Sequence, residues 1–168
     1  MPETMPRSLN PDDLHEAYAA IGAAVWHLQF LEDVVVTYLT MRLRLSRPVS
    51  RTEALDVLAA ERRKTLGVLF RDAKAAGVIN GDLARAFEAL VGERNWLIHS
   101  AMLDCSDGLY TDEGRFSLLS RVRQLAQDAI DLKKRIYVDV RDWCIQQGID
   151  VGMAEAMGGR EFKAMRGA

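Results

Sequence analysis

The residues best suited to chemistry lie close together in the stretch 93–100, which reads ERNWLIHS. Arg94 carries a planar fork of donors that matches a phosphate, and His99 exchanges a proton near neutral pH. These groups could cleave a phosphodiester without a metal. His99 would exchange a proton with a ribose 2′-hydroxyl or a leaving 5′-oxygen, Arg94 would stabilise charge on the phosphate, and Asn95 would position the imidazole or the phosphate.

Helical geometry does not bring these three side chains onto one atom. Asn95 and His99 are four residues apart and share a face, whereas Arg94 lies about 140° around the axis from His99. Convergence therefore requires either fraying at the end of the helix or a second copy facing the first across a dimer axis. The second solution predicts a homodimer, in which each subunit contributes one imidazole.

The elements that must position these residues are helical throughout. Asn10-Pro11-Asp12-Asp13 supplies a cap and a first turn for a helix that runs to about Leu45. Its predicted apolar stripe is interrupted by one acid, in the order Leu14, Tyr18, Ile21, Val25, Leu28, Glu32, Val35 and Leu39. A capping box at 50–53 opens a second helix that ends at Gly77. Its inward residues are predicted to be Leu55, Leu58, Leu66, Leu69 and Ala73.

A third helix is predicted to begin at 80–82 and to end near Ala101, with Arg94 on its inward stripe. A polar loop over 104–114 follows, and a fourth helix runs from about Arg115 to Gln147. The sequence therefore predicts an all-α fold: an antiparallel up-down four-helix bundle with long first and fourth helices. One domain is expected over 1–148, followed by a tail over 149–168 that is a short helix or disordered.

Two polar side chains on inward stripes need partners, since an unpaired buried charge is costly. Glu32 and Arg94 are candidates for each other. One hypothesis is that Glu32 orients Arg94 toward a phosphate, and the alternative is that the pair only joins two helices. Trp96 has two interpretations as well, because it could stack on a base or fill a core or dimer interface.

The pattern Arg-Asn-x-x-x-His near the end of the third helix of a small all-α domain resembles the HEPN (higher eukaryotes and prokaryotes nucleotide-binding) superfamily. The resemblance implies a dimeric helical bundle and, in active members, a metal-independent endoribonuclease of toxin-antitoxin or other defence systems. Arg94, Asn95 and His99 are the residues carried over. An antitoxin protein is then an expected partner. Some toxins carry a Tyr two residues beyond the His that a nucleotidyltransferase modifies, but this chain has Ala101 there.

A non-catalytic interpretation competes with this one. His99 and Arg94 suit the negative end of a helix dipole, where they could bond free carbonyls. The chain would then be a helical dimer that binds a nucleotide, RNA or a protein.

The overall composition limits the function classes. The 168 residues carry a net charge of −2, which argues against a protein that coats nucleic acid. Any RNA contact must be local, and the candidates are four arginines between the first two helices: Arg42, Arg44, Arg47 and Arg51. No spacing of ligands suggests a metal, and no motif suggests a cofactor. Without a secretory leader or a stretch of ~20 apolar residues, a cytoplasmic protein that does not enter membranes is expected.

Overall fold

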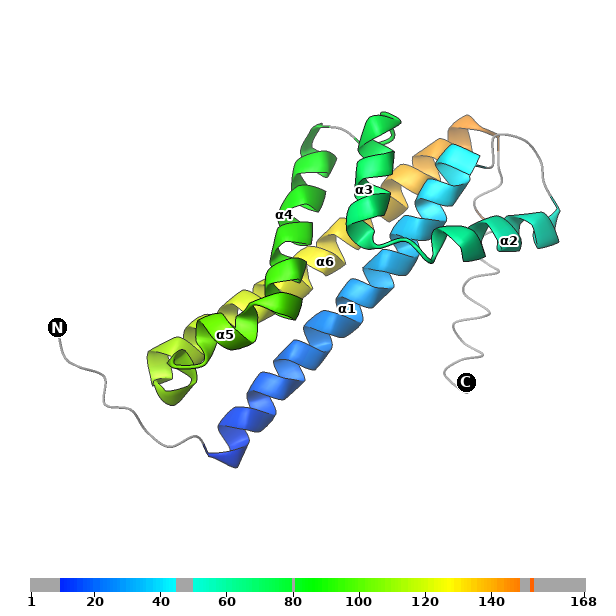
Figure 1. The fold of residues 1–168 in the computed structure, drawn as a ribbon. Coiled ribbons are helices and arrows are strands. Elements are labelled where there is room, and N and C mark those ends of the chain that lie inside the picture. Colours follow the sequence, from blue (N-terminus) through cyan, green and yellow to red (C-terminus); the bar gives the residue numbers. More distant parts are fainter. Residues whose placement is uncertain (1–9, 45–49, 80, 149–151, 153–168) are drawn as a thin grey trace. The chain divides into compact units, whose positions relative to one another are not determined.

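The computed structural model describes residues 10–44, 50–79, 81–148 and 152, and these form helices and turns without a strand. The predicted all-α class is confirmed. The elements are α1 (Pro11–Arg44), α2 (Arg51–Glu61), α3 (Leu66–Ala75), α4 (Gly81–His99), α5 (Ala101–Cys105), the 3-10 turn η1 (Gly108–Tyr110) and α6 (Asp112–Gln146) (Figure 1).

The predicted helix starts are present where a side chain caps the first turn. Asn10 Oδ1 accepts from the backbone N–H of Asp13 at 2.8 Å, and Asp13 Oδ2 accepts from the N–H of Asn10 at 3.4 Å. Ser50 Oγ accepts from the N–H of Glu53 at 3.1 Å, so this cap forms as its sequence indicates.

The buried face of α1 differs from the predicted stripe in its first half. Tyr18 was expected inside and is 69% exposed, whereas Ala17 and Ala24 are buried. From Leu28 onward the prediction and the structure agree, with Leu28, Val35 and Leu39 all buried. The first half has apolar side chains on most of its faces, so its periodicity does not identify the buried one.

The predicted second helix is wrong as a single element, because it divides into α2 and α3. The break lies at the basic residues 62–64, and Thr65 caps the new helix by accepting from the N–H of Val68 at 3.4 Å. Lys64 secures the turn through ion pairs with Glu61 and with Asp72. As a consequence Leu55 is 52% exposed instead of inward, while Leu66, Leu69 and Ala73 are buried as predicted.

Glycines end the helices on either side of this region as expected. Gly77 follows α3 with φ of 68°, and Gly148 follows α6 with φ of 71°. Both conformations are left-handed and are costly for residues with a Cβ atom.

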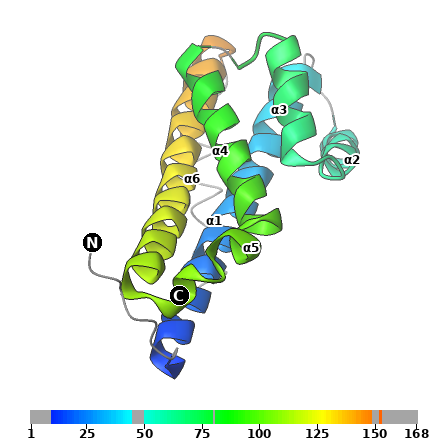
Figure 2. The same ribbon diagram turned by 60° about the vertical axis from the view of Figure 1, so that its left-hand side comes forward.

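The chain changes direction at the end of α4. The helix ends at His99, two residues before the predicted end, and Ser100 (φ −125°, ψ −26°) leads into α5. The predicted polar loop over 104–114 therefore contains the end of α5 and the 3-10 turn η1. Figures 1 and 2 show α5 leaving the direction of α4 in both views.

The chain divides into two compact units between Lys133 and Lys134, inside α6. Within the first unit, two polar pairs join the start of α1 to the first half of α6. Glu16 of α1 bonds Arg123 of α6 at 2.6 Å, and the buried Arg115 of α6 lies 3.9 Å from Asp13 of α1. Lys74 of α3 pairs with a carboxylate of α4. The predicted boundary at 148/149 stays a prediction, and the tail lies outside the described residues apart from Gly152.

The apolarity of α1 exceeds what the sequence analysis expected. An 18-residue window within Pro11–Leu43 has a mean hydropathy of 1.3, so length and composition alone would let this helix cross a membrane. That corrects the expectation that no stretch is apolar enough. The core helix of a soluble protein and a signal sequence meet the same criterion, and 28% of the window is buried.

Candidate functional site

Arg94 occupies the inward side of α4 and faces α1. Its Nη2 lies 3.5 Å from Oε1 of Glu32, and both side chains are about one-third exposed, at 29% and 32%. The pairing expected from the two interrupted stripes is therefore present. An ion pair at this depth keeps part of each group in contact with solvent, so one side of the guanidinium can meet a ligand.

Asn95 is bound by Arg94, its neighbour on α4. Its Oδ1 accepts from Nη1 of Arg94 at 3.3 Å. The arginine fork thus engages an acid on α1 and an amide on its own helix. This arrangement orients the guanidinium from two sides.

His99 is exposed at the last residue of α4, directly before the change of direction at Ser100. The helix end that convergence with Arg94 would need lies at this residue. Both residues lie inside α4, so helical geometry still places their side chains about 140° apart around the axis, and convergence stays a prediction for the dimer. The imidazole is accessible to a ligand from solution.

Trp96 belongs to a cluster that the sequence analysis missed. Arg121 of α6 bonds Glu93 through two hydrogen bonds, Nε to Oε2 at 2.7 Å and Nη2 to Oε1 at 2.9 Å. Its Cζ lies 3.5 Å from the centre of the Trp96 ring, within cation-π range. Trp96 Nε1 donates to Oδ2 of Asp104 on α5 at 3.1 Å.

A sequence signal for this cluster exists but points to no partner. Glu93 and Trp96 are three residues apart on one helical face, so an arginine from another helix could bind both. Nothing in the sequence identifies Arg121 as that arginine, because it lies 28 residues further on.

The cluster changes the acidity of its members. The two hydrogen bonds from Arg121 lower the pKa of the Glu93 carboxyl, and partial burial opposes this effect. Glu93 in turn raises the pKa of the Arg121 guanidinium. Both groups therefore stay charged at neutral pH, and the pair persists there.

The predicted arginine cluster near 42–51 is described only in part. The guanidinium of Arg42 lies 5.5 Å from the centre of the Tyr38 ring, and its Nη1 donates to the Tyr38 hydroxyl at 3.3 Å. Arg47 and the side chains of Arg44 and Arg51 lie outside the described residues. Nearby, Arg62 is bound to Asp33, so its charge is partly neutralised.

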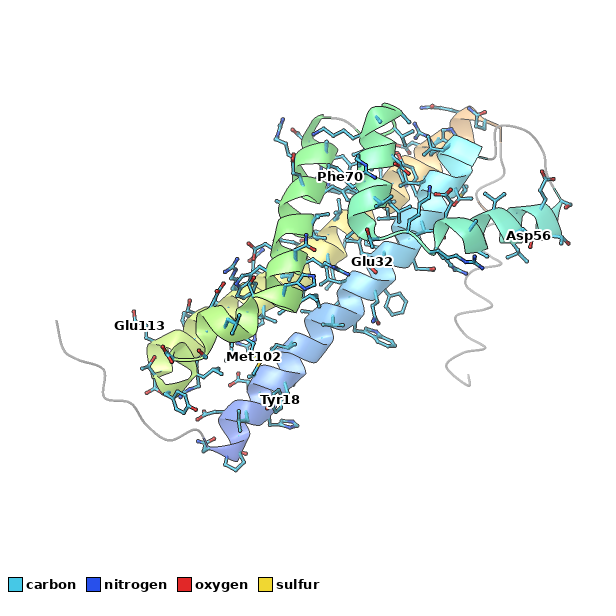
Figure 3. The ribbon with its side chains drawn as sticks, viewed as in Figure 1. Tyr18, Glu32, Asp56, Phe70, Met102 and Glu113 are labelled. Carbon is cyan, nitrogen blue, oxygen red and sulfur yellow. The ribbon has the colours of Figure 1, made fainter. Side chains whose placement is uncertain are left out.

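Large apolar side chains lie exposed next to the motif and on α1. Ile98 precedes His99 and is 48% exposed, Met102 of α5 is 87% exposed, and Tyr18, Trp26 and Phe30 project from α1. Figure 3 labels Met102 on α5 and Tyr18 in the first part of α1. Exposed apolar side chains of this size make the segment beside His99 and the face of α1 separate candidates for an interaction surface.

Among the described residues, no group of three or more His, Cys, Asp or Glu side chains could hold a metal ion. The site therefore offers a cation with two partners and an exposed imidazole. These suit proton transfer and stabilisation of an anion. Comparisons with family models, with curated proteins and with solved structures found no match to this chain.

Proposed function

We propose that this chain is a HEPN-like, metal-independent endoribonuclease that acts as a homodimer. The observation that carries the proposal is the arrangement at the end of α4. Arg94 is oriented by Glu32 and Asn95, and His99 is exposed five residues later where the helix ends. Phosphodiester cleavage requires proton transfer, which the imidazole supplies, and stabilisation of negative charge on the phosphate, which the guanidinium supplies.

In the proposed arrangement α1, the α2–α3 pair, α4 and α6 form a four-helix bundle that departs from strict up-down order. Asp13 and Glu16 near the start of α1 meet Arg115 and Arg123 in the first half of α6, so these two helices run in the same direction and α4 runs against them (Figure 1).

The bundle brings Glu32 of α1 and Arg94 of α4 to one rim. Glu32 is then a positioning residue: it holds the guanidinium by one side and leaves the other for phosphate. Arg42, Arg44, Arg47 and Arg51 would guide the RNA backbone toward this rim.

The reaction uses the substrate's own nucleophile. His99 of one subunit takes the proton of the 2′-hydroxyl, whose oxygen forms a bond to phosphorus as the bond to the 5′-oxygen breaks. His99 of the second subunit donates a proton to that leaving oxygen, and Arg94 stabilises the charge on the phosphate oxygens. The products are a 2′,3′-cyclic phosphate and a free 5′-hydroxyl. DNA lacks the nucleophile and is not cut.

Dimerisation supplies the second imidazole and covers apolar surface. Ile98 and Met102 flank His99, so a second copy that shields them would bring its own His99 close. A homodimer is also the commonest closed assembly. As a toxin or defence component, such an enzyme would require an antitoxin protein to restrain it.

A cytoplasmic location is part of the proposal. The apolar window of α1 contains Glu32 and Asp33, and each is paired with a cation from elsewhere in the first unit. Charged groups are costly inside a bilayer, whereas they are readily placed when α1 is the core helix of a folded bundle.

A second candidate function is a non-catalytic dimer that binds a nucleotide, RNA or a protein. It is favoured by the two partners that Arg94 already has, because an arginine bound by Glu32 and Asn95 is typical of a structural joint. In that case substitution of Arg94 would lower stability or dimerisation and any binding together.

The deciding experiment is cleavage of a mixed structured RNA in excess EDTA. Wild type is compared with His99→Ala and with His15→Ala, which removes another exposed imidazole, and all three are checked for dimer mass. We expect wild type and His15→Ala to cut and to leave cyclic phosphate ends, and His99→Ala to be inactive. Equal cutting by His99→Ala, or none by wild type, would reject the enzyme.

A further inference from the structure

His99 is the last residue of α4, so its direction depends on how firmly the last turn of this helix is held. Ser100, at the break between α4 and α5, makes no side-chain cap bond to α5, and neither proline nor glycine stands at the break. The backbone continues through Ser100 by two hydrogen bonds, from its N–H to Trp96 and from the N–H of Asp104 to its carbonyl. Helix ends fray, so side chains that bind the last turn of α4 from other helices fix its position.

One side-chain hydrogen bond crosses the break directly. Trp96 lies three residues before His99, and its indole N–H donates to the carboxylate of Asp104, five residues after His99. The bond therefore ties the last turn of α4 to the last turn of α5. While it holds, the angle between the two helices cannot change without moving the Trp96 ring.

A third helix fixes that ring. The guanidinium of Arg121 covers one face of Trp96 at 3.5 Å, and its two hydrogen bonds to Glu93 prevent it from sliding along the ring. The fork is bidentate, so a lysine could not reproduce its geometry. Arg121 thus links α6 to α4, and the hydrogen bond from Trp96 to Asp104 links α4 to α5.

We propose that Arg121 and Trp96 are positioning residues that set the direction of His99. The proposal rests on the function proposed above, because it assigns these residues to the same site. It also changes the role expected for Trp96: one ring face is occupied by Arg121, so the ring orients the imidazole instead of stacking on a base.

If the cluster served only to stabilise the fold, its loss would lower global stability, and the exposure of its members argues against that. Glu93 and Arg121 are 38% and 45% exposed, and exposed ion pairs contribute little to global stability. Loss of the cluster should therefore leave the fold intact and act locally, at the break. The chain has three histidines, so the imidazole signal of His99 can be assigned by comparison with His99→Ala.

The test compares Trp96→Phe, which keeps a ring and loses the N–H, with Arg121→Lys, which keeps the charge and loses the fork. Arg123→Lys is the matched control, since Arg123 lies on the same helix and bonds Glu16. The readouts are the thermal midpoint, the NMR imidazole signal of His99, and kcat and KM on RNA. We expect both variants to fold, to shift or broaden the His99 signal, and to lose about 10- to 100-fold in kcat with KM nearly unchanged.

The other possible outcomes each contradict part of the proposal. An unchanged His99 signal in both variants would overturn the inference, whether or not RNA is cut. A changed His99 signal with unaltered kcat would show that the direction of His99 does not limit the reaction. A rise in KM alone would indicate that Trp96 stacks on a base of the RNA. If wild type does not cut, the proposed function fails, while the NMR comparison still decides the positioning.

Trp96→Phe combined with Asp104→Asn gives an internal check. Both changes act on one hydrogen bond, so the double variant should shift the His99 signal no further than the larger single change. Additive shifts would show that the two residues act separately and would remove Asp104 from the proposal.

Discussion

Glu32 and Arg94 show how two residues that look misplaced on apolar stripes can explain each other. Each interrupts a run of inward side chains, and the two meet at 3.5 Å. Because both keep about a third of their surface exposed, the pair should contribute little to global stability. The effect of the pair on the free energy of unfolding and its effect on RNA cleavage therefore have to be measured separately.

We expect Glu32→Gln to lower the free energy of unfolding by no more than about 1 kcal/mol, as is usual for a partly exposed pair. Urea denaturation of Glu32→Gln, Arg94→Gln and the double variant gives the coupling between the two side chains. RNA cleavage by Glu32→Gln should fall much more than its stability does. A loss of activity that only parallels unfolding would identify the pair as a structural joint.

Glu93 gives the cluster a defined response to acid. Its pKa is lowered in the folded state from an ordinary value of 4.5, so its pairing stabilises the fold above that value. The contribution is lost as the pH falls through the lower, folded pKa. Stability measured against pH should therefore separate wild type from Glu93→Gln by less than about 1 kcal/mol at pH 6 to 7, because the pair is partly exposed, and bring them together in acid. A constant difference down to about pH 2 would contradict this assignment.

At the scale of elements, the turn that leads into α6 depends on two glycines that touch, Gly108 in η1 and Gly114 in the first turn of α6. A Cβ atom placed on Gly114 would lie 2.6 Å from the carbonyl carbon of Gly108, and backbone cannot move aside as a flexible side chain can. The same turn holds the buried Arg115, whose Nη1 donates to the carbonyl of Leu109 at 2.8 Å. The start of α6 is therefore closely packed.

Gly114→Ala should lower the free energy of unfolding by about 1–3 kcal/mol, since the added methyl group overpacks this turn. Gly92→Ala is the matched control, because a Cβ atom there meets nothing within 4 Å and the residue lies inside α4. That change should stabilise the protein by about 0.5–1 kcal/mol through the unfolded chain. Calorimetry on both variants decides, and a neutral Gly114→Ala would show that the turn can relax.

The elements that could be predicted are those whose signals are local. Asn10 and Ser50 cap helices through bonds to residues three positions away, so the sequence alone reveals them. Thr65 caps α3 in the same way, but it stands within an apolar pattern that continues across residues 62–64, and the break was missed. The pairing of Arg121 with Glu93 could not be predicted, because only packing of α6 against α4 selects it.

At the scale of the whole molecule, the exposed apolar residues beside His99 bear on assembly. Met102 is 87% exposed, and a second copy would cover it in the proposed dimer. Met102→Glu should then weaken the dimer at least about tenfold, equivalent to about 1.4 kcal/mol, because an acid would be buried without a partner. Sedimentation over a range of concentrations measures this effect.

Ala59→Glu on α2 places the same charge at an exposed position away from the motif and should leave the dimer intact. Cleavage per subunit should fall with the dimer in Met102→Glu and recover at high protein concentration. Full activity of a monomeric Met102→Glu protein would end the shared-site mechanism.

The link between Glu16 and Arg123 spans 107 residues, and Arg121 lies only two positions before its end. A ribosome releases the N-terminal part of a chain first, so Arg94 and His99 emerge before the arginine that anchors their helix. The Arg121–Glu93 pair spans 28 residues, whereas the Glu16–Arg123 link closes a much longer loop at a higher entropic cost. Under the proposed function, the growing chain would therefore carry Arg94 and His99 without the Arg121 cluster until residue 121 has been made.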